Sequence, residues 1–143
     1  LQTFSKSKKV DFSTIPIAIE TQYETDIDLL QQLAKSLSEK VFKINSLQRK
    51  NIHIAAVFVN NFTNHLYKIA NDIADENQFP FEILLPLIDE TTYKIHYLKP
   101  KEAQTGPAKR HDSITINNHL QSISNKTYHD IYQLLTKSIQ ENG

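Results

Sequence analysis

The chain of 143 residues carries 16 basic and 16 acidic side chains, so its formal net charge at neutral pH is zero. This balance gives no electrostatic reason for binding nucleic acid or an anionic membrane, and neither is expected as a partner. No apolar run approaches the roughly 20 residues of a membrane-spanning helix. The absence of cysteine excludes disulfides and cysteine-ligated zinc, and we expect a cytoplasmic protein. Because methionine is also absent, we expect a processed product or a fragment of a longer chain.

The first part of the chain has the pattern of a strand, a helix and a second strand. Residues 14–20, TIPIAIE, form a short and nearly continuous apolar run, which is typical of a buried strand. Residues 25–38 place apolar side chains at helical spacing, and residues 41–44, VFKI, have the character of another strand. A strand, helix and strand in this order predict a crossover unit of an α/β sheet. Two strands alone cannot bury both faces of a sheet, so we expect this unit to be the tail of a larger one.

From residue 51 onward the pattern is helical. Residues 52–77 contain no glycine or proline and predict one long helix, inside which residues 54–59, IAAVFV, are apolar on every side. The middle of this helix must therefore be covered by other helices or by a partner subunit. Three more helices are expected, one of them starting at Pro80 and kinked at Pro86. They should span residues 80–98, 113–123 and 128–140.

A single internal glycine marks the stretch AQTGPAKRHD at residues 103–112. Pro107 favours the first position of a helical turn, and Asp112 or Ser113 is expected to cap the next helix. Gly106 has two interpretations. It turns the corner of the chain, or its amide and those of the following turn form an anion-binding nest beside the planar guanidinium of Arg110.

The long helix also carries a polar stripe. Its members near the apolar centre need hydrogen-bond partners, so they either join helices or line a cleft. These residues are His53, Asn60, Asn61 and Asn64. Further along the helix, a solvated outer face is the better interpretation for Lys68, Asn71 and Asp75.

Motifs for other chemistries are missing from the sequence. The six histidines include no His-Glu-x-x-His pair, so no metal site is expected. No nucleophile elbow and no glycine-rich phosphate loop occurs either. We therefore expect this chain alone to bind no nucleotide tightly.

Several stretches together resemble a known family. LQTFS, IPIAIE, IHIAAVFVNNFTNHLY and AQTGPAKRHD are similar, in this order, to the Rossmann-like NAD(P)-binding oxidoreductases whose C-terminal half is a helical domain of unknown function. These are relatives of pyrroline-5-carboxylate reductase and of the 6-phosphogluconate dehydrogenase C-terminal-like group. The most specific motif is T-G-P-x-x-R-x-D at residues 105–112, followed by His-x-Ala-Ala at residues 53–56, with Asn61 beyond it.

The resemblance implies a mainly α fold and two domains. Residues 1–45 would be the C-terminal remnant of a dinucleotide-binding domain, and residues 46–143 a helical domain for substrate binding and dimerisation. The cofactor would be NADP or NAD in the full-length parent, with none expected for this chain alone. The long helix would form a homodimer interface. The implied catalytic residues are His53 and Asn61, and the implied substrate-binding residues are Thr105, Gly106, Arg110 and Asn64.

The reaction implied by the resemblance is the reduction of a small imine or carbonyl compound by hydride. Related hydroxyacid dehydrogenases place a catalytic lysine on the long helix, whereas the first lysine here is Lys68, at the end expected to be solvated. This difference argues against lysine-assisted oxidation of a hydroxy acid. His53 or Asn61 would only orient the substrate, because the cofactor supplies the hydride. The alternative from another class is a non-catalytic helical dimerisation or protein-interaction module, in which the asparagine stripe joins helices.

Overall fold

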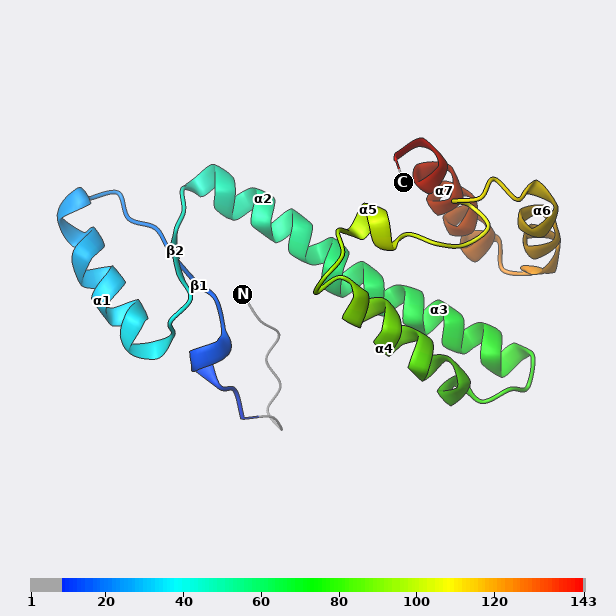
Figure 1. The fold of residues 1–143 in the computed structure, drawn as a ribbon, viewed down its shortest axis with the longest axis horizontal. Coiled ribbons are helices and arrows are strands. Elements are labelled where there is room, and N and C mark those ends of the chain that lie inside the picture. The colour runs from blue at the N-terminus through cyan, green and yellow to red at the C-terminus, as the bar shows by residue number, and fades with distance from the viewer. Residues whose placement is uncertain (1–8, 143) are drawn as a thin grey trace. The chain divides into compact units, whose positions relative to one another are not determined.

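The computed structural model describes residues 9–142, so the opening LQTFS lies outside the described residues. The fold is mainly helical, with a short parallel sheet near the start, and this confirms the predicted fold class (Figure 1). The chain divides into two compact units, Leu1–Asn64 and His65–Gly143, which we call the N-terminal and C-terminal units. This division falls inside the long helix. The domain boundary between residues 45 and 46 stays a prediction about the origin of the two parts.

The N-terminal unit begins with the predicted crossover. After a 3-10 turn at Phe12–Thr14, strand β1 (Ile17–Ile19) leads through a second turn at Glu24–Asp26 into helix α1 (Ile27–Leu37). Strand β2 (Val41–Lys43) then pairs with β1 in parallel, with Ile17 opposite Val41. Figure 1 shows α1 as the connection between the two strands. The strand, helix and strand pattern is therefore confirmed.

A small core holds this crossover together. Ile15, Ile19 and Ala34 are buried, and the buried hydroxyl of Ser38 donates a hydrogen bond of 2.7 Å to the carbonyl of Ile15. The same hydroxyl oxygen accepts the amide of Lys40 at 3.1 Å. Ser38 therefore ties the end of α1 to the chain just before β1, and its buried polar atoms are satisfied.

The long helix runs continuously through α2 (Ser46–Ala56), a π-helical segment at Val57–Phe62, and α3 (Thr63–Glu76). It begins at Ser46 rather than at the predicted residue 52 because Asn45 forms a capping box. The Asn45 side chain accepts the amide of Gln48 at 2.8 Å, and the Gln48 side chain accepts the amide of Asn45 at 2.9 Å. Both bonds satisfy amides that the first helical turn leaves without partners.

The π-helical segment was not predicted. At its end the Thr63 hydroxyl donates a hydrogen bond of 3.0 Å to the carbonyl of Phe58, five residues earlier. Such a side chain satisfies a carbonyl where the backbone ladder is wider than in an α-helix. This wide turn overlaps the apolar stretch at residues 54–59 that was expected to need covering.

The C-terminal unit continues with a series of shorter helices. After the 3-10 turn Phe81–Leu84 come α4 (Leu85–Lys94), α5 (Pro100–Ala103), α6 (Ser113–Ser122) and α7 (Lys126–Asn142). The helices predicted near residues 113 and 128 are confirmed, whereas α5 was missed. Buried apolar residues of this unit are Ile69, Ala74, Ala108 and Ile116. No helix in residues 9–142 is long and apolar enough to cross a membrane.

Two prolines correct the predicted helix over residues 80–98. Pro80 has an extended conformation and is the N-cap of the 3-10 turn, not the first helical residue. Pro86 lies in the first turn of α4, where its missing amide has no partner to lose. The predicted kink is therefore wrong, because α4 begins at Leu85 and Pro86 lies at its start instead of bending its interior.

Candidate functional site

An open hollow of about 1050 Å³ lies on the N-terminal unit. It follows β1, includes the residues directly after both strands, and extends over the first turns of α2. Most of its lining is apolar, with a few polar and charged groups. The lining residues are Phe12, Ile15, Pro16, Ile17, Ala18, Glu20, Ile44, Ser46, Arg49, Lys50, Ile52, His53 and Ile54.

A polar cluster joins the end of β1 to the first turns of α2 at this hollow. The Glu20 carboxylate accepts a hydrogen bond from the Ser46 hydroxyl and pairs with Arg49 Nε at 2.7 Å. The Ser46 hydroxyl and then the Arg49 guanidinium hold the pKa of Glu20 below its ordinary value. The cluster fixes the start of α2 against the strand. Sequence patterns missed it, because Glu20 lies 26 residues from Ser46 and 29 from Arg49.

Of the two predicted catalytic residues, His53 lines the hollow and Asn61 does not. His53 is exposed on α2, two turns into the helix that Asn45 caps. Asn61 is exposed in the π-helical segment, and Asn64 is exposed in the first turn of α3. The structure therefore places His53 beside an apolar cavity and leaves the role of the two asparagines a prediction.

The predicted turn at Gly106 is present in the C-terminal unit. Gly106 has a φ of +104°, and a Cβ added there would meet no atom within 4 Å. The glycine is therefore required by the backbone conformation and not by a close neighbour. Two hydrogen bonds close the turn. The amide of Arg110 donates to the carbonyl of Gly106 at 3.3 Å, and the amide of Asp112 donates to the carbonyl of Pro107 at 3.0 Å.

Asp112 ends this turn as the N-cap of α6, as predicted. Its carboxylate accepts the amide of Thr115 at 3.1 Å and the Thr115 hydroxyl at 2.8 Å. The backbone amide of Thr115, and next its hydroxyl, hold the pKa of Asp112 below the ordinary value. The neighbouring Arg110 is exposed, and within residues 9–142 its guanidinium makes no ion pair or hydrogen bond. The charge of Arg110 also helps to lower the pKa of Asp112, and the anion nest stays a prediction.

The six predicted site residues thus fall in two groups. His53, Asn61 and Asn64 belong to the N-terminal unit, while Thr105, Gly106 and Arg110 belong to the C-terminal unit. Within the C-terminal unit, Gly106 and Arg110 lie in one turn, and Thr105 directly precedes that turn. That both groups face one substrate stays a prediction.

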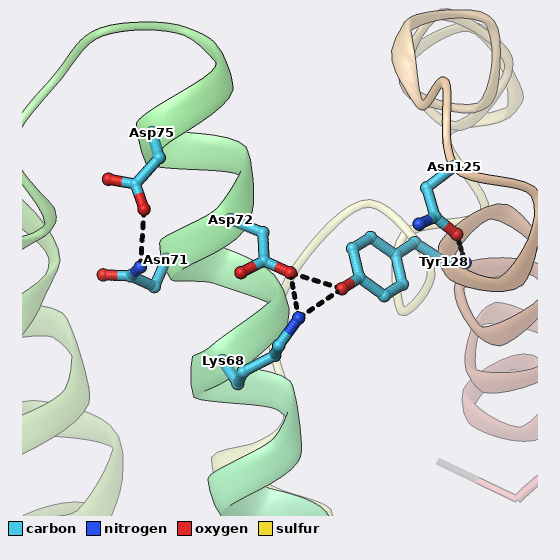
Figure 2. A network of polar contacts seen from close by, with 6 residues as sticks. All are labelled: Lys68, Asn71, Asp72, Asp75, Asn125 and Tyr128. Carbon is cyan, nitrogen blue, oxygen red and sulfur yellow. Dashed lines mark hydrogen bonds and ion pairs between the residues drawn. The ribbon is translucent and has the colours of Figure 1, made fainter.

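A second polar cluster, Lys68, Asp72 and Tyr128, was missed by sequence analysis. Lys68 Nζ donates to the Tyr128 hydroxyl at 2.8 Å, and the Asp72 carboxylate accepts hydrogen bonds from both (Figure 2). Lys68 also lies 5.6 Å from the centre of the Tyr128 ring. Lys68 was expected on a solvated face, and its side chain is 57% exposed as predicted, but its bonds to Asp72 and Tyr128 were not foreseen. The i,i+4 spacing of Lys68 and Asp72 was a readable signal, but Tyr128 is 60 residues away from Lys68.

This cluster joins α3 to α7. The hydrogen bond to Asp72 raises the pKa of Lys68 above its ordinary range, and the same bond lowers the pKa of Asp72. Lys68 is therefore a charged donor and not a catalytic base. Next to the cluster, Asn71 donates to Asp75 at 2.9 Å, so these two form a local pair on α3 (Figure 2).

Comparison with known proteins places the chain in a family. A structure from Bacteroides fragilis named "putative NADP oxidoreductase BF3122" is 46% identical, with a TM-score of 0.90 over 99% of this chain and 55% of that one. Protein TM1727 from Thermotoga maritima is 24% identical, with a TM-score of 0.66 over 82% of this chain and 50% of that one, and this likeness shows the fold alone.

This chain therefore spans about half the length of each of these two proteins. No curated protein matches the sequence. The specific kinship with pyrroline-5-carboxylate reductase and the 6-phosphogluconate dehydrogenase group stays a prediction. The family is established by a match over residues 15–139, and the chain belongs to the family described as a domain of unknown function, DUF2520.

Proposed function

We propose that this chain is the substrate-binding and dimerisation portion of an NADP-dependent oxidoreductase that reduces a small imine or carbonyl compound. The observation that carries this proposal is the position of His53 on an apolar hollow beside two parallel strands. The name of the Bacteroides fragilis relative supports the reaction class and favours NADP over NAD.

The position of the hollow fits a redox site. In open parallel sheets, ligands bind outside the carboxyl ends of the strands. Glu20 directly follows β1 and Ile44 directly follows β2, and both line the hollow. An apolar cavity with a few polar groups is also the usual form of a small-molecule site.

The residues present fit only one end of a dinucleotide. The sequence contains no glycine-rich turn of the kind that holds the pyrophosphate, so this chain offers no cradle for it. The apolar hollow beside His53 suits a flat nicotinamide ring or the body of a substrate. When bound, the cofactor supplies the hydride.

The roles of this chain's own residues follow from their chemistry. The exposed imidazole of His53 donates a hydrogen bond to the carbonyl oxygen or imine nitrogen of the substrate and orients it. Asn61 and Asn64 supply further amide donors from the same long helix. Thr105, Gly106 and Arg110 hold an acidic group of the substrate, for which the planar guanidinium is suited.

The dimer surface is the apolar side of the π-helical segment. Ile54, Phe58, Val59 and Phe62 are 49%, 62%, 74% and 50% exposed, and the rings of Phe58 and Phe62 lie 5.1 Å apart in an edge-on arrangement. Exposed apolar patches of this kind are typical of protein interfaces. A second copy of the chain, related by a two-fold axis, would cover the patch on both partners.

The test is a reduction assay on a protein that combines this chain with its dinucleotide-binding domain. We expect NADPH to be oxidised in the presence of a member of a panel of small keto acids and cyclic imines. Dimer formation without NADPH binding would instead favour the alternative, a non-catalytic interaction module.

A further inference from the structure

A smaller crevice of about 260 Å³ lies within the C-terminal unit, between α4 and α5. Its lining combines one face of α4 with α5 and the two residues that follow it. The α4 face is regular, because positions 87, 90, 91 and 94 follow the spacing of one helical stripe. The lining residues are Leu87, Glu90, Thr91, Lys94, Ile95, Pro100, Ala103, Gln104 and Thr105.

Two opposite charges lie side by side on this lining. Lys94 Nζ pairs with the Glu90 carboxylate at 3.1 Å, and the two side chains are 35% and 51% exposed. Each charge keeps free hydrogen-bonding positions, because an ammonium has three donors and a carboxylate several acceptor sites. The pair therefore presents a positive group that can bind an anion and a negative group that can bind a cation, about one hydrogen-bond length apart.

This spacing matches the two charges of an α-amino acid. Standard bond lengths place the ammonium nitrogen and the nearer carboxylate oxygen of such a molecule roughly 3 Å apart. Laid head to tail beside the protein pair, the ligand carboxylate meets Lys94 while the ligand ammonium meets Glu90. Such charge-assisted hydrogen bonds are the strong class.

Neutral groups on the lining extend this complementarity. In residues 9–142 the Thr105 hydroxyl has no hydrogen-bond partner, and it can donate to a carboxylate. The side-chain amide nitrogen of Gln104 donates a hydrogen bond to the Thr105 carbonyl at 2.9 Å. The side-chain oxygen of Gln104 is left to accept from an ammonium. Leu87 and Ile95 are 64% and 53% exposed and offer apolar surface for a short aliphatic side chain.

We propose that the crevice between α4 and α5 binds a small aliphatic α-amino acid, with its carboxylate on Lys94 and Thr105 and its ammonium on Glu90 and Gln104. The site shares Thr105 with the substrate-binding residues proposed above, but it rests on this crevice alone. A binding measurement on the isolated chain therefore tests it without any turnover.

The experiment follows amide NMR shifts of the 143-residue chain during titration with L-valine. We expect saturable shifts at the lining residues of α4 and α5. Isobutyrate and isobutylamine, which each lack one of the two charges, should bind at least about tenfold more weakly. Lys94→Gln and Glu90→Gln should each weaken L-valine binding by about tenfold as well.

A matched control separates recognition from general charge. Lys126 forms the same kind of i,i+4 pair with Asp130 at 3.0 Å and does not line the crevice, so Lys126→Gln should leave binding unchanged. Ala103→Leu keeps both charges and fills the crevice, so it should abolish binding even if Lys94→Gln loses helix content. The proposal is overturned if L-valine gives no saturable shifts, if isobutyrate binds equally well, or if Ala103→Leu binds like the wild type.

Discussion

The phenol of Tyr128 on α7 donates a hydrogen bond to the carboxylate of Asp72 on α3, and its oxygen accepts one from Lys68 at 2.8 Å (Figure 2). A carboxylate, an ammonium and a phenol therefore form hydrogen bonds with one another across two helices that are far apart in sequence. This arrangement links α3 to α7 through ionised Asp72 and charged Lys68.

Asp72→Asn should destabilise the chain in a pH-dependent way. The hydrogen bonds from Lys68 and Tyr128 lower the pKa of Asp72 from 3.8, so its stabilisation is present above that pH and is lost as the pH falls further. Thermal melts of the wild type and the variant should differ at pH 7 and converge as the pH falls well below 3.8.

Asp89→Asn is the control for this pH series. Asp89 is exposed on α4, and its side chain makes no hydrogen bond or ion pair in the described part of the chain. The melting curve of Asp89→Asn should follow that of the wild type at every pH. If the difference in melting temperature between the wild type and Asp72→Asn stays constant between pH 7 and pH 2, the carboxylate charge plays no part in the stability.

Gly106→Ala should lower the free energy of unfolding by about 1 kcal/mol or more. The cause is backbone strain alone, because the added Cβ would meet nothing within 4 Å while φ is +104°. Denaturant titration measures the change. His111, with a φ of +54°, is the opposite case, and His111→Gly should relieve strain and cost little. Equal stability of Gly106→Ala and the wild type would remove the turn as the reason for this glycine.

Val59→Glu should convert a dimer into a monomer. Val59 is 74% exposed beside Phe58 and Phe62, and a carboxylate buried in a two-fold interface would face its own copy. Sedimentation velocity measures the change. Ile114→Glu is the matched control, because Ile114 is 75% exposed on α6 and outside the proposed interface. A monomeric wild type would exclude the homodimer.

The parts of the fold set by local pattern were predictable from sequence. The crossover strands and the helices beginning near residues 113 and 128 follow from apolar spacing and from caps such as Asp112. The early start of the long helix was also predictable, since Asn45 and Gln48 have the spacing of a capping box. The apolar pattern alone predicts a start at later residues.

What sequence could not supply is contact between distant residues. His53 was found because it belongs to a family motif, whereas its neighbours in the hollow come from β1, from the residues before it and from the residues directly after both strands. The bonds of Glu20 to Ser46 and of Asp72 to Tyr128 depend on how helices and strands pack. The π-helical segment at Val57–Phe62 carries no glycine or proline that would have signalled it.

Arg110→Ala should leave the melting temperature nearly unchanged, because the guanidinium is exposed and makes no bond in the described residues. In a longer protein that joins this chain to the proposed dinucleotide-binding domain, kcat/KM for an acidic substrate should fall about tenfold or more. Arg110→Lys should recover little of it, since a point charge cannot replace the planar fork. Lys109→Ala, at the adjacent exposed residue, should have no effect. Unchanged turnover in Arg110→Ala would leave the motif a purely architectural turn.

The proposed reduction site is tested most directly by the turnover of His53→Ala in that same two-domain protein. His53 lines the apolar hollow and is exposed, so its loss should lower kcat/KM for the imine or carbonyl substrate at least about tenfold while the melting temperature stays nearly unchanged. His96→Ala, at an exposed histidine outside the hollow, should retain wild-type kcat/KM. Wild-type kcat/KM in His53→Ala would contradict the assignment of the hollow as the site of reduction.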